Sequence, residues 1–103
     1  RHLRPKPHYK LIIGREEGEN NYLSGYRHEF TTIKTISHKG PLALVDGVAG
    51  DADLREASVI VARYSQGRDA DAVEVEIAGP DGAVTRQLVQ PMSSVDVEQS
   101  WHV

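Results

Sequence analysis

The chain has 103 residues, of which 39% are hydrophobic and 26% are charged, and its net charge is −3. These values are typical of one small globular domain, and the sequence lacks both a signal-peptide pattern and the run of ~18 apolar residues that a membrane-spanning helix needs. The chain contains no cysteine, which excludes disulfides and thiolate metal sites, and we expect a cytoplasmic protein with no membrane contact.

The first eight residues, RHLRPKPH, contain two prolines and show no periodicity. We therefore expect residues 1–8 to form an extended linker that arrives from an upstream domain. Because the chain begins with Arg1 and not with a methionine, we also expect it to be part of a longer protein.

The first half of the chain predicts three strands and one short helix. YKLIIGR, residues 9–15, is β-branched and stops after Gly14, which is typical of a strand. Residues 19–26 fit one or two helical turns, and FTTIKTIS at 30–37 alternates as a strand does. PLALVDG at 41–47 is a continuous apolar run, which indicates a strand buried on both faces.

The second half predicts a long helix followed by a hairpin. Apolar and small residues recur at helical spacing between Asp51 and Gln66, and Asp53 with Glu56 suggests a capping box. AVEVEIAG then alternates strictly, Pro80-Asp81-Gly82 predicts a turn, and AVTRQLVQP returns as its partner strand.

These elements predict an α+β fold within a single domain at residues 9–91. We expect a small, mainly antiparallel sheet of about five strands, with one long helix (about 51–66) and one short helix packed on one face. Residues 92–103 are mostly polar and are predicted to be a C-terminal tail or an edge strand.

Charge is distributed unevenly along the chain. Residues 1–40 carry eight basic side chains and four glutamates, whereas residues 41–103 carry four basic and eleven acidic side chains. Four of the five histidines also lie in the basic segment. This pattern fits either an ordinary solvated surface or a local patch that faces a polyanion.

The sequence gives little support for catalysis. It contains no nucleophile elbow and no pair of histidines at metal-binding spacing on a helix. GREEGENN, residues 14–21, lacks the glycine spacing of a phosphate-binding loop, and its glutamates would repel phosphates. We expect no catalytic residue, no cofactor and no metal in this domain.

Binding fits the residue types better. The basic segment mixes cations, which contact phosphates, with flat side chains, on which bases stack. If they converge on one exposed face, they make a surface for RNA; alternatively, the aromatic residues at i, i+4, i+8 spacing belong to the core. The residues concerned are Arg15, Arg27, Lys34 and Lys39, together with Tyr22, Tyr26, His28 and Phe30.

Three segments, taken in order, resemble the NFACT-R family of RNA-binding domains. They are GREEGENNYL after the first strand, HKGPLALVDG around a glycine turn, and the helix end YSQGR followed by VEV. The resemblance covers about residues 9–91 and rests on the order of all three segments. Seven residues match the family pattern: Gly14, Arg15, Asn20, Gly40, Tyr64, Ser65 and Arg68.

The resemblance implies an α+β fold and contact with RNA. Two family histidines near the glycine turn are replaced by Lys34 and Leu42 in this chain, Tyr64 is equally compatible with a core position, and Gly14 and Gly40 with shaping the backbone. Charge pattern and resemblance together predict an RNA-binding set: Arg15, Asn20, Arg27, His28, Lys34, His38, Lys39 and Arg68.

The variant that the chain resembles most is attached to ThiI-like or PP-loop ATPase modules, which put sulfur into tRNA uridines. The resemblance thus implies a tRNA-binding accessory domain of a tRNA sulfurtransferase or methyltransferase, with ATP bound by the parent and not by this domain. The alternative, motivated by the acidic second half of the chain, is a structural domain that docks on its own upstream catalytic module.

Overall fold

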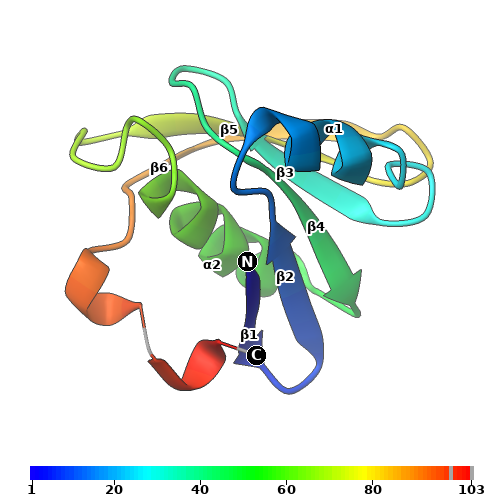
Figure 1. The fold of residues 1–103 in the computed structure, drawn as a ribbon, viewed down its shortest axis with the longest axis horizontal. Coiled ribbons are helices and arrows are strands. Elements are labelled where there is room, and N and C mark those ends of the chain that lie inside the picture. Colours follow the sequence, from blue (N-terminus) through cyan, green and yellow to red (C-terminus); the bar gives the residue numbers. More distant parts are fainter. Residues whose placement is uncertain (98, 103) are drawn as a thin grey trace.

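Six antiparallel strands form one sheet in the computed structural model, which describes residues 1–97 and 99–102 (Figure 1). The strand order across the sheet is β1-β2-β4-β3-β5-β6. The strands are β1 (His2–Lys6), β2 (Tyr9–Ile13), β3 (Thr31–Thr35), β4 (Leu42–Gly47), β5 (Val73–Ala78) and β6 (Val84–Val89). Two α-helices, α1 (Glu17–Ser24) and α2 (Asp51–Arg63), complete the α+β fold that was predicted.

The sixth strand comes from the segment that was predicted to be a linker, so that prediction is wrong for residues 2–6. β1 pairs antiparallel with β2, and Leu3 is fully buried. The two prolines were interpreted as evidence against a strand. β1, however, lies at the edge of the sheet, where the N–H that a proline lacks is not needed for a second ladder. The pairing register shifts between Leu3 and Lys6, across Pro5.

The long helix was predicted at 51–66 and ends earlier, at Arg63. Its N-cap is Gly50, and the Asp53 carboxylate accepts a hydrogen bond from the Gly50 N–H at 3.1 Å. Asp53 therefore lies inside the first turn, and the predicted capping box of Asp53 with Glu56 is wrong. Glu56 instead accepts a 2.7 Å hydrogen bond from the hydroxyl of buried Tyr9, which ties α2 to β2.

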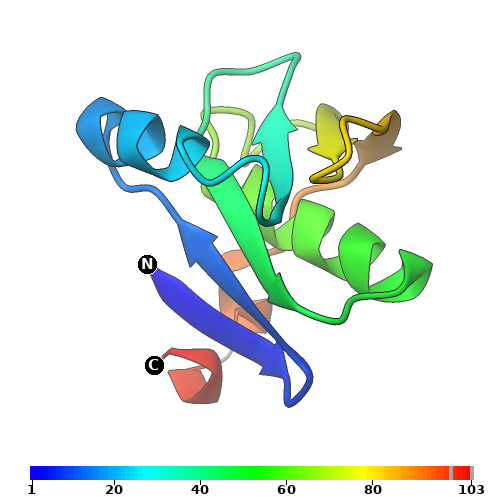
Figure 2. The same ribbon diagram turned by 90° about the vertical axis from the view of Figure 1, so that its right-hand side faces the viewer.

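The two helices lie on opposite faces of the sheet (Figure 2). Successive residues of β4 point to opposite faces: Ala43 and Val45 belong to the core that α2 covers, whereas Leu44 lies beneath α1 beside Leu23. The expectation of both helices on one face is therefore wrong. The continuous apolar run in β4 predicted that this strand is buried on both faces, and a helix on each face of the sheet agrees with that prediction.

Residues 92–97 and 99–102, the described part of the C-terminal segment, contain no strand. They turn through two short 3₁₀ helices, η1 (Ser94–Asp96) and η2 (Gln99–Trp101), and His102 forms an isolated bridge with Leu3. Glu98 and Val103, which belong to the predicted tail, lie outside the described residues. In the part of the chain that the structure describes, no helix has the length and apolar character to cross a membrane.

Candidate nucleic-acid interface

Three segments that are distant in the sequence meet at one hollow of about 450 Å³, which we call the Arg15–Arg68 pocket. It lies between the start of α1, the turn before β4 and the end of α2, and it is lined by residues 14–17, 20, 39–41, 64–66 and 68. All seven residues that carry the motif resemblance line it: Gly14, Arg15, Asn20, Gly40, Tyr64, Ser65 and Arg68. The three motifs are therefore parts of one site.

The backbone of the turn before β4 lies close to the backbone at the end of α2, and the two segments are hydrogen-bonded at the bottom of this pocket. The Gln66 N–H donates a 2.7 Å hydrogen bond to the Lys39 carbonyl, which fastens the turn to the end of α2. A Cβ atom on Gly40 would lie 2.5 Å from Thr35 Oγ1 and 2.7 Å from Ser65 Cβ. Glycine is therefore required at position 40 for the turn and the helix to touch.

Asn20, predicted to contact RNA, has a structural bond within the pocket wall. Its Oδ1 accepts a 3.1 Å hydrogen bond from the Leu42 N–H, which links α1 to the start of β4. The same amide group lies against Gly14, where a side chain would collide with Oδ1. Asn20 thus sets the distance between the motif that begins at Gly14 and the motif around Gly40.

Replacing Asn20 by alanine is expected to lower the free energy of unfolding by about 1 kcal/mol, because the Leu42 N–H loses its acceptor in a half-buried position. In a domain of this size the thermal midpoint should fall by roughly 4–8 °C. Asn20→Asp is the matched control, since it keeps an oxygen acceptor, and it should remain close to the wild-type midpoint. Equal losses in both variants would show that the hydrogen bond to Leu42 does not matter.

The three cations of the pocket differ in whether they already form an ion pair within the protein. Arg15 is exposed and forms an ion pair with Glu19, with Nη2 and Oε2 2.9 Å apart. The hydrogen bond from the Arg15 side chain lowers the pKa of the Glu19 carboxyl, so the pair is ionised at neutral pH. Lys39 and Arg68 are also exposed, and neither forms an ion pair with another described residue. Two of the three cations are therefore available to an anion.

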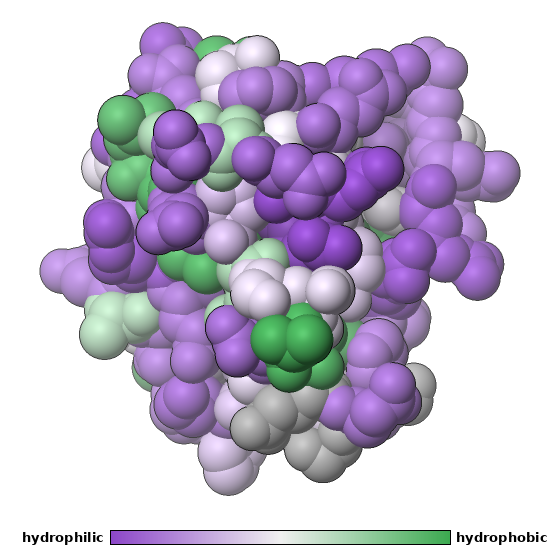
Figure 3. Space-filling model, turned by 90° about the vertical axis from the view of Figure 1, so that its left-hand side faces the viewer, coloured by the Kyte–Doolittle hydropathy of each residue, from purple (hydrophilic) through white to green (hydrophobic). Residues whose placement is uncertain are grey.

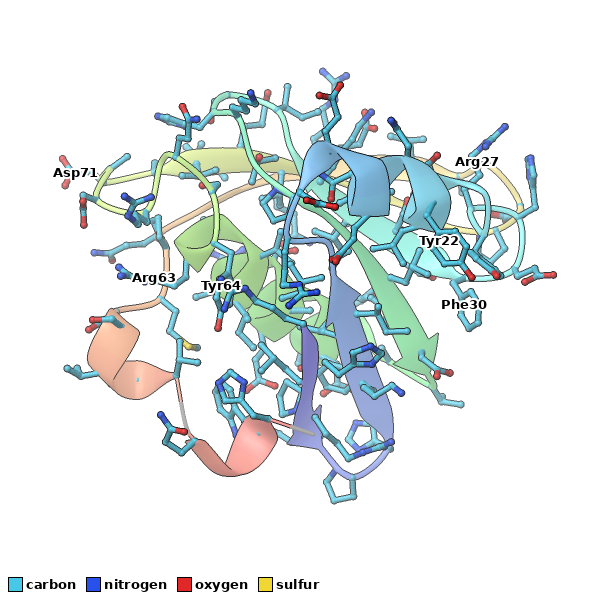
Figure 4. The ribbon with its side chains drawn as sticks, in the orientation of Figure 1. Tyr22, Arg27, Phe30, Arg63, Tyr64 and Asp71 are labelled. Atoms are coloured by element: carbon cyan, nitrogen blue, oxygen red, sulfur yellow. The ribbon has the colours of Figure 1, made fainter. Side chains whose placement is uncertain are left out.

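Arg27, His28 and Lys34 lie elsewhere, in a separate hollow of about 360 Å³ beside the β5–β6 turn. Lys34 is 3.4 Å from Glu76, which also pairs with Arg86 at 3.3 Å, so these two cations share one carboxylate. Figure 4 shows Arg27 and Tyr64 well apart along the long axis of the molecule. The four cations that were expected to converge therefore line two hollows, Arg15 and Lys39 the one and Arg27 and Lys34 the other.

His38 supports the turn beside the Arg15–Arg68 pocket and is not among the residues that line it. Its Nδ1 lies 2.8 Å from Ser37 Oγ, and its half-buried ring fills the space that a side chain on Gly67 would need. His28 lines a different hollow from Glu16 and Glu17, so the pocket does not bring these groups together as an acid–base set. No group of three or more potential ligands among the described residues could hold a metal ion.

A third hollow, of about 790 Å³, adjoins the first and is called here the aromatic pocket. Tyr22, Tyr26 and Phe30 line one side of it, with ring centroids 5.5 Å apart for the two tyrosines and 6.3 Å for Tyr26 and Phe30. The tyrosine hydroxyls are 2.9 Å apart, and this hydrogen bond raises the pKa of Tyr26. Tyr22 is 67% exposed, so its assignment to the core is wrong.

Sequence reasoning identified these rings but missed the pocket, because the pocket also needs the outer face of the sheet. Its remaining wall includes Ile12 of β2 and Leu44 of β4, which are neighbours in register, and Leu23 of α1. Figure 4 shows Tyr22 and Phe30 close together beneath α1. Arg15 lines both the aromatic pocket and the Arg15–Arg68 pocket, so the two form adjoining parts of one surface.

The face on the left-hand side of Figure 1 differs from the aromatic pocket in its hydropathy. It is mostly hydrophilic, with only small and separate hydrophobic areas (Figure 3). It therefore offers no extended apolar surface to a protein partner.

Comparisons with known proteins concern the family and the fold of this chain. Residues 1–102 match the family model NFACT-R_2, described as the NFACT protein RNA binding domain. No curated protein matches the chain. Among solved structures, the chain is similar to the C-terminal part of the fibronectin/fibrinogen-binding protein from Streptococcus suis (FBPS), with a TM-score of 0.78 and 16% identity. That match covers 100% of this chain but 49% of the other, and at this identity it concerns the fold alone.

Proposed function

Because this chain belongs to the NFACT-R_2 family of RNA-binding domains, we propose that it binds RNA through the Arg15–Arg68 pocket and contributes no catalytic group. A phosphate in this pocket would meet Lys39 and Arg68 directly, and Arg15 after it exchanges Glu19 for the phosphate. Glu16 and Glu17 also line the pocket and oppose an anion, so the phosphate is expected on the side of Lys39 and Arg68. Exposed cations that neutralise phosphates supply most of the sequence-independent affinity for nucleic acid.

The observation that supports the proposal most strongly is the convergence of the three motifs. Seven residues spread from Gly14 to Arg68 line a single hollow, and the glycines and Asn20 hold its walls at fixed distances. Three cations from three different segments surround that hollow. Arg15 and Arg68 are themselves motif residues, and Lys39 is next to the motif residue Gly40.

Titration of the ¹⁵N-labelled domain with tRNA, followed by NMR, tests the proposal. We expect amide shifts that are largest at Arg15, Lys39 and Arg68, and an affinity that falls steeply as salt rises, because each phosphate contact releases counterions. An unstructured RNA of equal length, titrated in parallel, compares RNA classes. A complete lack of perturbation by either RNA at low salt would contradict RNA binding by this domain.

The more specific part of the proposal concerns the parent protein. We propose that the RNA is tRNA and that the domain is an accessory module, in the cytoplasm, of a tRNA-modifying enzyme of the uridine-thiolating type, with ATP bound by a PP-loop module. Its support is the motif resemblance described above. The full coding sequence tests it: a PP-loop signature in the same reading frame agrees with the proposal, and its absence from that frame contradicts it.

The competing function is docking on an upstream catalytic module, and one observation favours it. Val84 and Leu88, on the same side of edge strand β6, are 53% and 64% exposed. Replacing both by serine separates the two functions. If RNA binding is unchanged while association with the parent's catalytic module is lost, β6 is the docking edge and RNA binding resides elsewhere on the domain.

A further inference from the structure

We propose that the aromatic pocket holds one unstacked nucleobase, so that the domain selects single-stranded RNA over a continuous duplex. The inference rests on the proposed function, because it assigns the RNA class that the same surface recognises. It adds a second subsite, for a base, to the phosphate subsite formed by Arg15, Lys39 and Arg68.

The chemistry of the pocket fits a base. Tyr22, Tyr26 and Phe30 offer ring faces and edges, and Ile12, Leu23 and Leu44 supply apolar contact. Its volume of about 790 Å³ lies within the range of roughly 300–1,000 Å³ that small-molecule sites occupy. A planar, weakly polar group such as a nucleobase gains from stacking on such rings irrespective of its identity, so we expect little base specificity.

Charge at the rim indicates that the occupant carries a phosphate. Arg15 lines both pockets, and its ion-pair partner Glu19 and the cation Arg1 also line the aromatic pocket. The exposed cations Lys39 and Arg68 lie beyond Arg15. A base seated on Tyr22 would thus have its own phosphate near Arg15, and the next phosphates near the other two cations. This alternation of a flat hydrophobic hollow and cations is complementary to a nucleotide chain rather than to an apolar peptide.

The position of the aromatic pocket between α1 and the sheet excludes a continuous duplex. In an A-form helix the bases are stacked on one another and the major groove is too narrow for side chains to enter. The aromatic pocket lies between α1 and the sheet, so a base can reach it only when it is splayed out of its own strand. Loops, bulges and ends of RNA meet this requirement.

Tyr22 is the residue with which to test the inference. It is 67% exposed, so its removal should leave the fold intact, and thermal unfolding of each variant verifies that. We would measure the affinity of the chain for a single-stranded RNA of about 12 nucleotides, for a duplex of equal length and for an abasic strand with the same phosphates. The variants are Tyr22→Ala and Tyr22→Phe, and Tyr22→Phe keeps the ring while losing the hydroxyl bond to Tyr26.

We expect wild type to prefer the single strand over both other probes. Tyr22→Ala should weaken single-strand binding by roughly 5- to 150-fold, the loss that follows removal of one base–aromatic stack, and should leave the other two affinities unchanged. Tyr22→Phe should bind as wild type does. Upfield shifts of the Tyr22 ring protons on adding the single strand, and not the abasic strand, would support a base in the pocket.

Two outcomes would overturn the base subsite and leave RNA binding intact: unchanged single-strand affinity in Tyr22→Ala, or equal affinity of wild type for the single strand and the abasic strand. Failure of all three probes at low salt is a different result, because it removes the proposed RNA function as well.

Discussion

Replacing Arg15, Lys39 and Arg68 together by alanine is expected to lower the affinity for RNA by about 10²-fold or more at about 50 mM salt. Lys39 and Arg68 can each make a charge-assisted contact with phosphate worth about 1.5 kcal/mol or more, and every 1.4 kcal/mol corresponds to tenfold in affinity. Arg15 adds less to the affinity, because it gives up Glu19 when it contacts the phosphate. The plot of log affinity against log salt should also become shallower by about 2, since each contact with a single strand contributes about 0.7 to the slope. Binding measured by fluorescence anisotropy over a series of salt concentrations gives both quantities.

The matched control removes the same charge from the other cluster. Arg27, Lys34 and Arg86 are also three exposed cations, but Lys34 and Arg86 share Glu76. Their triple replacement by alanine should change the affinity far less and keep most of the salt slope. If the control loses more affinity than the variant of the Arg15–Arg68 pocket, the interface lies beside the β5–β6 turn, where the predicted contacts Arg27, His28 and Lys34 are found.

Gly40→Ala is expected to lower the free energy of unfolding by about 2–3 kcal/mol. The added Cβ would lie 2.5 Å from Thr35 Oγ1 and 2.7 Å from Ser65 Cβ, so the turn must move away from α2 or distort. Thr35 cannot yield easily, because its hydroxyl donates a 2.7 Å hydrogen bond to the His38 carbonyl. Since Lys39 and Arg68 sit on the two sides of this contact, RNA affinity should fall along with stability. Chemical denaturation and RNA titration of the same variant measure the two effects.

Gly18→Ala is the matched control for that substitution. Gly18 lies in the first turn of α1, where the nearest atom to an added Cβ is Glu16 Oε1 at 3.5 Å. Alanine there should stabilise the domain by up to about 1 kcal/mol through its better helix propensity. A Gly40→Ala variant as stable as wild type would mean that the turn and the helix end are not in contact as described.

Local signals in the sequence predicted most of the secondary structure correctly. Alternation identified β5, the turn at 80–82 identified β6 as its partner, and apolar spacing identified α2, because those patterns are local in the sequence. β1 was missed because its evidence is not local: Leu3 is one apolar residue among prolines and charges, and only its pairing with Leu11 of β2 gives it a place in the core.

For the candidate site, too, local sequence signals identified the motif residues, and features that depend on non-local packing were missed. The motif residues were found because the resemblance fixes their order, and they do line one pocket. The spacing of Arg15, Arg27 and Lys34 in the sequence does not reveal that the first lines one hollow and the other two line another. The aromatic pocket depends on which face of β4 Leu44 occupies, and that is settled only when the sheet order is known.

The pairing of Arg15 with Glu19 determines what kind of anion the surface can attract. A ligand that binds Arg15 must displace the Glu19 carboxylate, whose Oε2 lies 2.9 Å from Arg15 Nη2. A single acidic group therefore only replaces one ionic partner of Arg15 by an equivalent one, and gains almost no binding free energy. Under the proposed function, a chain of phosphates would meet Lys39 and Arg68 at the same time, and their combined attraction would outweigh the exchange. Glu19 would then compete with every anion for Arg15 and so favour polymers over small metabolites.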